Sequence, residues 1–476
     1  MSESRRWWAL AAVSLATFMT YLDNNVVNVA LPTIQRSLGL GLAGLEWIVS
    51  SYILVFAGLM LVGGRLADVY GRRRVFLAGL AVFTAASLAA GLADTSTVLI
   101  ASRALQGVGA ALLTPAALAI LPATFPDPRE RGLAVGIWSA VSALALALGP
   151  VTGGVISERW HWGWIYLINV PVGLATLAMA GYALDRRRSP VARRLDRAGL
   201  GTSSLALLAL TYGLIEGERH GWTSGLIMGS FAVAAAAAVT FVIVESRTAD
   251  PMIDLSLFRS RLFSGGVAAT GLWAFGIFGI YFFTALYLQN VLGFSPTKAG
   301  AAFVPMALVM AFVAAVSGPV AARVGTHRAV AGGLGLMALA VLGVSSVGSG
   351  GNLGDLMPWF VVYGVGAGLL VPLTATILGL LPAEREGVAS GVLNVSREVF
   401  GLLGVTVLGA IVSARQASEL AAGSAPLPAF LTAYQFTLVI AAVVVAVGVP
   451  VSLWALRAPR VPVRPVASPE PQLVAS

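Results

Sequence analysis

Apolar runs of about twenty residues recur along the whole chain, and a bilayer is the solvent that such runs fit. The hydrocarbon core is about 30 Å thick, so each membrane helix needs about 20 apolar residues. The composition agrees, with 58% hydrophobic and 11% charged residues against about 45–50% and about 25% in soluble domains. The sequence therefore predicts an all-α integral membrane protein with fourteen spans. They lie near residues 8–31, 46–64, 74–93, 97–121, 133–156, 163–184, 199–216, 223–245, 262–289, 298–321, 328–349, 355–380, 388–412 and 431–456.

The positions of the basic residues predict how the chain is oriented. Cytoplasmic loops of membrane proteins carry an excess of lysine and arginine. If both termini are cytoplasmic, only five of the 30 basic residues fall in outer loops. These five are Arg36, Arg159, Arg219, Lys298 and Arg415. We therefore expect a multi-pass protein of the cytoplasmic (inner) membrane with its N and C termini inside.

Several classes of function are excluded by what the sequence lacks. There is no cysteine, and all three histidines fall in predicted loops, so we expect no metal site and no cofactor. The chain contains no GxxxxGK[ST] sequence, so ATP is not expected to drive it. The net charge of +9 comes from arginines at the ends of apolar runs, which argues against a nucleic-acid partner. Fourteen spans also leave no soluble catalytic domain, so we do not expect an enzyme.

The two ends of the chain repeat one another in the same orientation. GRLADVYGRRR (64–74) shares two glycines and an arginine with GPVAARVGTHR (318–328), and QGVGAALLTP (106–115) matches YGVGAGLLVP (363–372) at seven of ten positions. Parallel halves of this kind are typical of transporters that rock around a site near the middle of the membrane. The repeat predicts two pseudo-symmetric six-helix bundles with two inserted helices. The expected boundaries are 1–184, 185–257 (inserted helices), 258–456 and 457–476 (disordered cytoplasmic tail).

One carboxylate and one arginine lie deep inside predicted spans. Asp23 is about eight residues from the outer end of span 1 and Arg103 about six from that of span 4, which places them at comparable depths at about 1.5 Å per residue. An intramembrane carboxylate costs about 2.5–3.5 kcal/mol on insertion scales and is a functional candidate by default. We interpret Asp23 as the leading proton or cation site and Arg103 as its electrostatic partner. The alternative is a salt bridge that only joins two helices.

Span 1 carries further polar side chains around Asp23. On a helical wheel they fall within one arc, which predicts a stripe facing a cavity. The stripe comprises Thr17, Thr20, Asp23, Asn24 and Asn28. Asn24 and Asn28 are therefore candidate substrate contacts.

A second acidic residue lies near the middle of span 13, in SGVLNVSREVFG (390–401). Asn394 lies four residues before Glu398 and shares its helix face. Arg397 is directed about 100° away, so we do not expect it to neutralise Glu398. Glu398 is a candidate second proton or cation site, with Asn394 as a substrate contact. The alternative is a polar contact to a water-filled cavity without a role in transport.

Span 9 is rich in aromatic residues, in LWAFGIFGIYFFTALYLQN (272–290). Because aromatic rings occur on opposite sides of this helix, they cannot all face one pocket. Tyr281 and Gln289 have polar tips that favour an inward face, and Phe278 and Phe282 lie near the same face. We predict that these four residues contact the substrate, and that the rings attract lipophilic cations.

Five short motifs occur in order along the first six spans. They are LDNNVVNVALP (22–32), GGRLADVYGRRRVF (63–76), SRALQGVGAA (102–111), LALGPVTGG (146–154) and WIYLINVPVG (164–173). Together they resemble the motifs of the major facilitator superfamily, and within it those of the fourteen-helix drug:proton antiporter family. The resemblance covers essentially the whole chain. Two positions depart from it, since Asn25 stands where threonine is more usual and Glu398 where glutamine is more usual.

The loop motif between spans 2 and 3 combines glycines with charged residues. A carboxylate and a guanidinium at a helix junction can form a charge-assisted pair that holds two helices in one state, and the glycines permit a tight turn. The resemblance implies that this motif is a conformational latch. Its residues are Gly64, Arg65, Asp68, Gly71, Arg72 and Arg74. The alternative, that the arginines only set the topology, does not account for Asp68.

The motif in span 5 removes side chains from one helix stripe. Small residues let helices approach closely, and proline loosens the local hydrogen bonds. The resemblance implies an antiporter motif that seals the outer side and prevents leak. Its residues are Gly149, Pro150, Gly153 and Gly154. Ordinary tight packing is the alternative.

The sequence thus predicts a proton-coupled antiporter that exports hydrophobic small molecules, cationic or amphipathic in kind. The alternatives are a dedicated exporter of one self-made metabolite or antibiotic and, less favoured, a proton-coupled uptake symporter. The expected partners are a small-molecule drug or metabolite, protons and membrane lipids. We expect the chain to act as a monomer.

Overall fold

The computed structural model describes residues 3–185, 196–248, 251–379 and 383–457. These ranges contain helices and no strands. The first bundle has α1 (Glu3–Leu38), α2 (Leu42–Tyr70), α3 (Arg72–Gly91), α4 (Ser96–Thr124), α5 (Pro128–Arg159), α6 (Trp164–Leu167) and α7 (Asn169–Ala183). The inserted helices are α8 (Arg197–His220) and α9 (Gly225–Arg247), followed by a short 3-10 helix η1 (Leu255–Arg259). The second bundle has α10 (Arg261–Asn290), α11 (Pro296–Ala302), α12 (Val304–Val324), α13 (Thr326–Ser345), α14 (Leu353–Gly368), α15 (Pro372–Leu378), α16 (Ala383–Ala421) and α17 (Pro426–Ala455).

Thirteen helical stretches in the described ranges are long and apolar enough to cross a membrane. Three of them are made of two consecutive helices, α6 with α7, α11 with α12, and α14 with α15. The remaining predicted span is α1, which runs alongside α5 and α7 but is less apolar because it carries Asp23 and its neighbouring asparagines. The predicted all-α membrane fold is confirmed.

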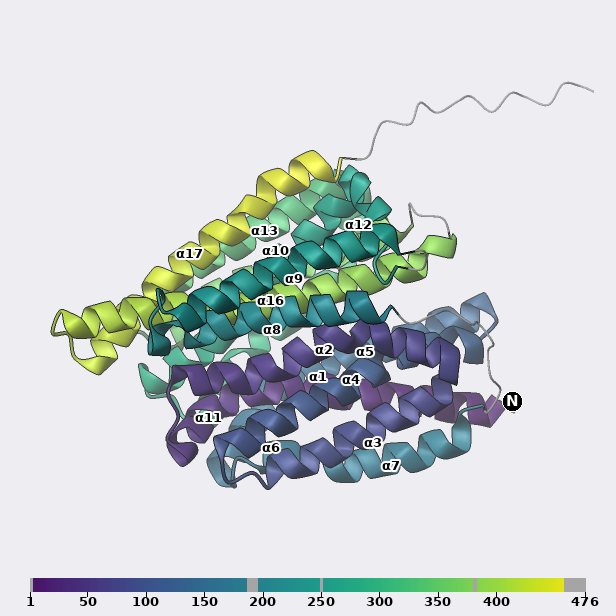
Figure 1. Cartoon of the computed structure of the whole chain (residues 1–476), viewed down its shortest axis with the longest axis horizontal. Coiled ribbons are helices and arrows are strands. Elements are labelled where there is room, and N and C mark those ends of the chain that lie inside the picture. Colours follow the sequence, from purple (N-terminus) through teal and green to yellow (C-terminus); the bar gives the residue numbers. More distant parts are fainter. Residues whose placement is uncertain (1–2, 186–195, 249–250, 380–382, 458–476) are drawn as a thin grey trace, which may run out of the picture.

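The helices form two bundles that lie against each other (Figure 1). Helices α1–α7 make one half, and α10–α17 make the other. The inserted helices pack on each other, and α8 contacts both α2 and α16 at the junction of the halves. The predicted domain boundaries at 184/185 and 257/258 stay a prediction. Residues 186–195 and 458–476, and with the latter nearly all of the predicted disordered tail, lie outside the described residues.

The internal repeat of the sequence is visible in how the helices touch. Gly109 of α4 packs on α3, where an added Cβ would lie 2.6 Å from the backbone nitrogen of Phe83. Gly366 of α14 is its counterpart, and an added Cβ there would lie 2.6 Å from the carbonyl oxygen of Gly333 on α13. Matching glycines thus make matching helix–helix contacts in the two halves, as expected for small residues at membrane helix interfaces.

The two halves also share a turn. Gly71 joins α2 to α3 with φ +96°, and Gly325 joins α12 to α13 with φ +90°. Positive φ is a conformation that glycine adopts without the steric penalty of a Cβ. The tight turn predicted for Gly71 is therefore present, together with its repeat.

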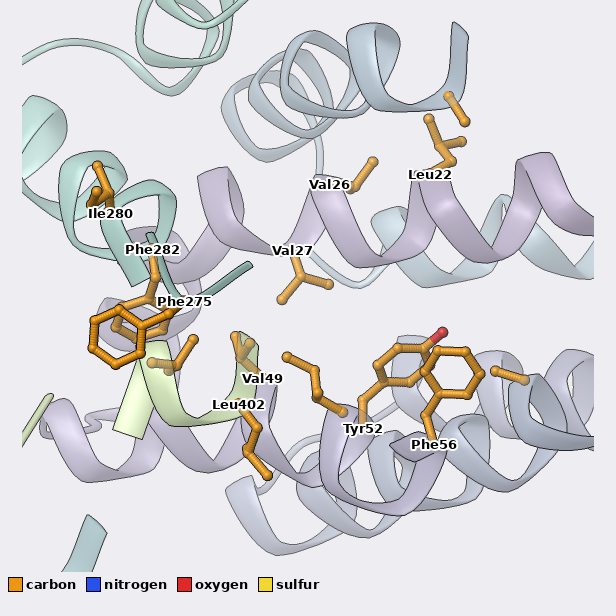
Figure 2. Close-up of a cluster of buried hydrophobic side chains, with 14 of the residues drawn as sticks. Leu22, Val26, Val27, Val49, Tyr52, Phe56, Phe275, Ile280, Phe282 and Leu402 are labelled. Atoms are coloured by element: carbon orange, nitrogen blue, oxygen red, sulfur yellow. The ribbon is translucent and has the colours of Figure 1, made fainter. Parts of the chain in front are cut away.

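Apolar side chains from both halves meet in the centre of the molecule (Figure 2). Val27 points from α1 toward α2, from which Val49, Tyr52 and Phe56 point back. The same cluster contains side chains of α10 and α16, namely Phe275, Ile280, Phe282 and Leu402. Tyr52 and Phe56 of this cluster also line the cavity described below.

We predict that Gly109→Ala destabilises the protein, whereas Gly136→Ala does not. A Cβ at Gly109 would force α3 and α4 apart, and overpacking of this kind costs about 1–3 kcal/mol. An added Cβ at Gly136 of α5 meets nothing within 4 Å, so the change should only improve helix propensity, by about 0.5–1 kcal/mol. Thermal unfolding in detergent measures the stability of both variants relative to the wild type. Equal melting temperatures for the two variants would contradict the close contact.

Candidate functional site

The structure brings Asp23 and Arg103 together at the matched depth that the sequence predicts. Arg103 Nη1 on α4 donates to Asp23 Oδ2 on α1, and neither side chain is exposed. A buried pair of this kind is stable only when further hydrogen bonds satisfy both ions. Its neighbours therefore matter as much as the pair itself.

The second oxygen of Asp23 is held by two amides. Asp23 Oδ1 accepts from Gln106 Nε2 at 3.0 Å and from Asn169 Nδ2 at 2.8 Å. The same Gln106 nitrogen donates to Ser87 Oγ at 2.8 Å. Side chains of α4 and α7 thus bind the carboxylate of α1 directly. Ser87 of α3 contributes through its hydrogen bond with Gln106. Gln106 and Asn169 were not predicted as site residues, although Gln106 lies one turn from Arg103 and Asn169 belongs to the fifth motif.

Arg103 links this cluster to α2. Its Nε donates to the Ile48 carbonyl oxygen at 3.2 Å, and its Cζ lies 4.5 Å from the centre of the Tyr52 ring. The Tyr166 ring lies 5.7 Å from the same Cζ on another side. A guanidinium over an aromatic face is attracted by the ring electrons. Tyr52 therefore forms a wall shared by the buried charges and the cavity described next.

A cavity of about 150 Å³ lies between the two halves. Its walls come from both bundles and are mostly aromatic and aliphatic, with a polar edge of asparagines from α1. Among the described residues, Arg397 and Glu398 are the charged side chains that line it. The full lining comprises Thr20, Tyr21, Asn24, Asn25, Asn28, Tyr52, Phe56, Thr114, Leu146, Pro150, Trp273, Ile277, Phe278, Tyr281, Phe303, Met306, Ala307, Met310, Arg397 and Glu398. This is a shape and composition suited to an amphipathic small molecule.

Most of the predicted substrate contacts line this cavity. They are Asn24, Asn28, Phe278 and Tyr281, together with the candidate acid Glu398. Asp23 does not line it, so the predicted stripe on α1 is divided. The arc is wide enough that its asparagines face the cavity while Asp23 faces α4 and α7.

Three predicted substrate contacts lie elsewhere. Phe282 is fully buried against Phe283, with ring centres 4.7 Å apart. Gln289 Nε2 donates to the carbonyl oxygen of Val29 at 2.8 Å and so joins α10 to α1. Asn394 Nδ2 donates to the carbonyl oxygen of Ser390 within α16. The first is a core residue, the second a contact between the halves, and the third a local helix contact.

The expectation that Arg397 does not neutralise Glu398 is wrong. Arg397 Nη2 lies 2.8 Å and Nε 3.1 Å from Glu398 Oε1. The angle of about 100° between adjacent residues applies to the Cβ atoms, and both side chains are long enough to bend toward the same space. Arg397 Nη2 also lies 3.4 Å from the Tyr21 hydroxyl, which accepts its hydrogen bond.

Two further acidic side chains are buried, Glu46 and Glu216. Glu46 of α2 is 1% exposed and packs against Gly409 of α16, in the other half. Glu216 of α8 accepts from Trp47 Nε1 at 2.9 Å and lies 3.5 Å from His220 Nδ1. The contact of Glu46 with Gly409 contributes to the junction between the bundles.

The glycines of the α5 motif provide close helix contacts. A Cβ at Gly149 would lie 2.5 Å from Asn25 Cβ, and one at Gly153 would lie 2.5 Å from the Val26 carbonyl oxygen, both on α1. Gly154 instead meets Pro296 at the start of α11, in the other half. Close packing therefore occurs both within the first bundle and between the bundles.

We call the end of the molecule where α1 ends and α2 begins the predicted outer end. Further contacts between α5 and α11 lie there. Gly300 of α11 packs against the Pro150 carbonyl oxygen. The backbone nitrogen of Thr297 donates to Glu158 Oε2 at 2.9 Å. The backbones of α5 and α11 approach this closely because each helix has a glycine at the contact, Gly154 and Gly300.

The α2–α3 motif does not form the predicted ion pair. Among the described residues, Asp68 has no salt-bridge partner. Arg72 Nη1 instead donates to the Ala119 carbonyl oxygen of α4 at 2.8 Å, and Arg65 Nη2 donates to that of Pro251 at 3.3 Å. The two arginines therefore bind backbone carbonyl oxygens, one within α4 and one in the segment before η1. Arg74 is exposed, and Gly64 makes an ordinary contact with Pro115.

Comparison with known proteins places the chain among transporters. The family model of the Major Facilitator Superfamily matches residues 13–405. Multidrug resistance protein Stp of Mycobacterium tuberculosis is 35% identical over 406 residues, covering 85% of this chain and 75% of that protein. The tetracenomycin C resistance and export protein of Streptomyces glaucescens is 37% identical over 416 residues, covering 87% and 77%. A solved bacterial homolog of the human lysosomal transporter Spinster, inward-facing and unoccupied, matches with a TM-score of 0.68 at 18% identity over 96% of this chain and 98% of that one.

We predict that Asp23→Asn and Arg103→Gln each destabilise the protein by about 3–5 kcal/mol, because each leaves an unpaired buried charge. The double variant should recover most of this loss, since no charge then remains in the cluster. Thermal unfolding of the four proteins gives the coupling. The partly exposed pair of Arg6 and Glu130 is the control, and Arg6→Gln should cost about 0–1 kcal/mol. Additive losses in the double variant would contradict the pairing.

Proposed function

This chain belongs to the Major Facilitator Superfamily, and we propose that it is a proton-coupled antiporter that exports hydrophobic or amphipathic small molecules across the cytoplasmic membrane. The observation that carries the proposal is a mostly apolar cavity between two repeated halves, with a buried ionisable cluster behind one wall. Relatives named for multidrug resistance and for resistance to or export of antibiotics support the substrate class.

Asp23 is the proposed proton carrier. Its two oxygens accept from Arg103, Gln106 and Asn169. A proton on either oxygen replaces an acceptor by a donor, removes the charge that Arg103 neutralises, and so weakens the hold of α1 on α4. Loss of the proton restores the pair. The cluster thus has two arrangements that differ by one proton, as a coupling element requires.

Tyr52 is the proposed link between the proton and the substrate. Its ring lies under the Arg103 guanidinium on one side and lines the cavity on the other. When Arg103 loses its carboxylate partner, the guanidinium shifts and the cavity wall shifts with it. Substrate and proton then influence each other without touching.

Alternating access follows from the two halves moving about this centre. In the described arrangement the halves are joined at the predicted outer end through Gly154 and Gly300. We propose that this contact closes the outer side while substrate enters from the cytoplasm, and that it separates for release. The cavity is complete within one chain, so a monomer surrounded by lipid suffices. We propose that both termini lie in the cytoplasm, because that orientation places most of the basic residues there.

A dedicated exporter of one antibiotic is the second candidate. Relatives named for a single compound, such as the tetracenomycin C protein and the cephamycin export protein CmcT of Amycolatopsis lactamdurans, favour it. The two proposals differ in how many unrelated compounds the chain transports. A panel of antibiotics in the transport assay below separates them.

We predict that Asp23→Asn abolishes transport driven by a proton gradient. Inside-out vesicles that contain the wild type should take up labelled tetracenomycin C or puromycin when their interior is acidified, and an uncoupler should stop uptake. Asp23→Asn should fall to the level of vesicles without the protein, because the carboxamide cannot release a proton. Asp94→Asn makes the same chemical change at an exposed position and should transport normally. Gradient-driven uptake by Asp23→Asn at the wild-type rate would refute the role of Asp23.

The role of Tyr52 predicts different results for two substitutions at one position. Tyr52→Phe keeps the ring under Arg103 and should retain gradient-driven uptake. Tyr52→Leu removes the ring, so substrate should still bind while uptake no longer responds to the proton gradient. Equal coupling in the two variants, measured in the same vesicles, would show that the ring is not the link.

A further inference from the structure

The charge of the cavity is balanced by an internal pair. Glu398 is the acidic side chain on its described lining, and its Oε1 is bound by two nitrogens of Arg397. The side chain of Glu398 is 5% exposed and that of Arg397 is 23% exposed. The arginine side chain is therefore the more accessible of the two. A permanent cation entering this space would meet arginine before it met a free carboxylate.

Hydrogen-bond donors in the cavity wall lack partners. Trp273 Nε1 and the Tyr281 hydroxyl are buried, and neither has a hydrogen-bond partner in the described part of the chain. Indole nitrogen can only donate, and a buried donor left unpaired costs about 1–3 kcal/mol. Both residues belong to α10, two turns apart on the side that lines the cavity. A ligand that accepts hydrogen bonds would satisfy them.

The remaining wall is apolar and largely aromatic. Phe278 and Phe303 present aromatic rings, with the Tyr281 and Phe303 ring centres 4.2 Å apart. Such a wall favours planar, lipophilic molecules of any charge by burial of apolar surface. Aromatic rings alone therefore do not select cations. The charged and donor groups decide the preference.

From this arrangement we infer that the cavity prefers neutral or anionic amphipathic molecules that carry carbonyl, carboxylate or phenolate acceptors, rather than permanent cations. Arg397 of α16 would bind the acceptor with its remaining N–H groups, and Trp273 and Tyr281 would donate from the neighbouring helix α10. The inference rests on the proposed function, because it names the substrate class of the same cavity. It reverses the cationic preference predicted from the aromatic residues of span 9, because Arg397 is paired with Glu398, the acidic side chain on the described lining.

A pair of ions of similar shape and opposite charge tests the charge preference. We expect protein in lipid nanodiscs to bind tetraphenylborate more tightly than tetraphenylphosphonium after subtraction of empty nanodiscs. Glu398→Gln should strengthen tetraphenylborate binding by about tenfold, which corresponds to about 1.4 kcal/mol. Arg397→Gln frees the Glu398 carboxylate and should strengthen tetraphenylphosphonium binding instead. Lipid takes up each ion equally for all variants. The differences in affinity between variants therefore report on the protein alone.

Removal of both charges supplies the matched control. The variant Arg397→Gln/Glu398→Gln removes both charges, leaves a polar side chain at each position and should bind the two ions with less discrimination than either single variant. Tighter binding of tetraphenylphosphonium by the wild type, or no response of either ion to the two single changes, would overturn the inference. Failure of the proposed function appears separately, as absence of gradient-driven uptake in vesicles.

The acceptor preference has a test of its own. Benzophenone carries a carbonyl that diphenylmethane lacks, and the wild type should bind benzophenone more tightly. Trp273→Phe and Tyr281→Phe keep the rings and remove the donors, so each should reduce this difference. An unchanged difference in both variants would overturn the role of these donors.

Discussion

The buried ion pair of Asp23 and Arg103 is the interaction on which the rest of the structure depends. Neither ion is exposed, and each is held by further polar groups from neighbouring helices. Inside a membrane protein such a pair is stable only while it is complete, because removal of one partner leaves an uncompensated charge in a medium of low dielectric. A proton on Asp23 makes that removal reversible. In the proposed mechanism, the interaction that fixes α1 on α4 is also the one on which the proton gradient acts.

Close backbone contacts give the two halves a junction that can separate. At the predicted outer end, Gly154 and Gly300 each bring α5 and α11 backbone together, and Gly409 of α16 leaves room for the carboxylate of Glu46 on α2. Such contacts rest on small residues and few interlocking side chains. The cavity lies between the halves, so its walls belong to both moving bodies. A shift at Tyr52 on one wall can therefore alter the fit of a ligand held against the other.

The membrane explains why so much of the fold could be predicted from the sequence. Every span must be a helix of about 20 residues, and the repeated motifs predicted the pairing of the halves. The contact of Asp23 with Arg103 followed from depth, because the unpaired alternatives are so unfavourable in lipid. The direction of long side chains could not be predicted. Arg397 reaches Glu398 by bending, and Gln289 reaches the backbone of α1 rather than the cavity. Helical periodicity gives the direction of Cβ and leaves the last three or four bonds open.

We propose that the protonation state of Asp23 controls the junction between α5 and α11, because α1 carries Asp23 and packs closely on α5. The chain has no cysteine, so Arg159→Cys and Lys298→Cys, both exposed and on opposite sides of this junction, accept spin labels at these two sites alone. The distance distribution between the labels should change with pH when Asp23 is present and should not change with pH in Asp23→Asn. The exposed control Asp94→Asn should behave like the parent. The same pH-dependent change in Asp23→Asn as in the parent would contradict the account.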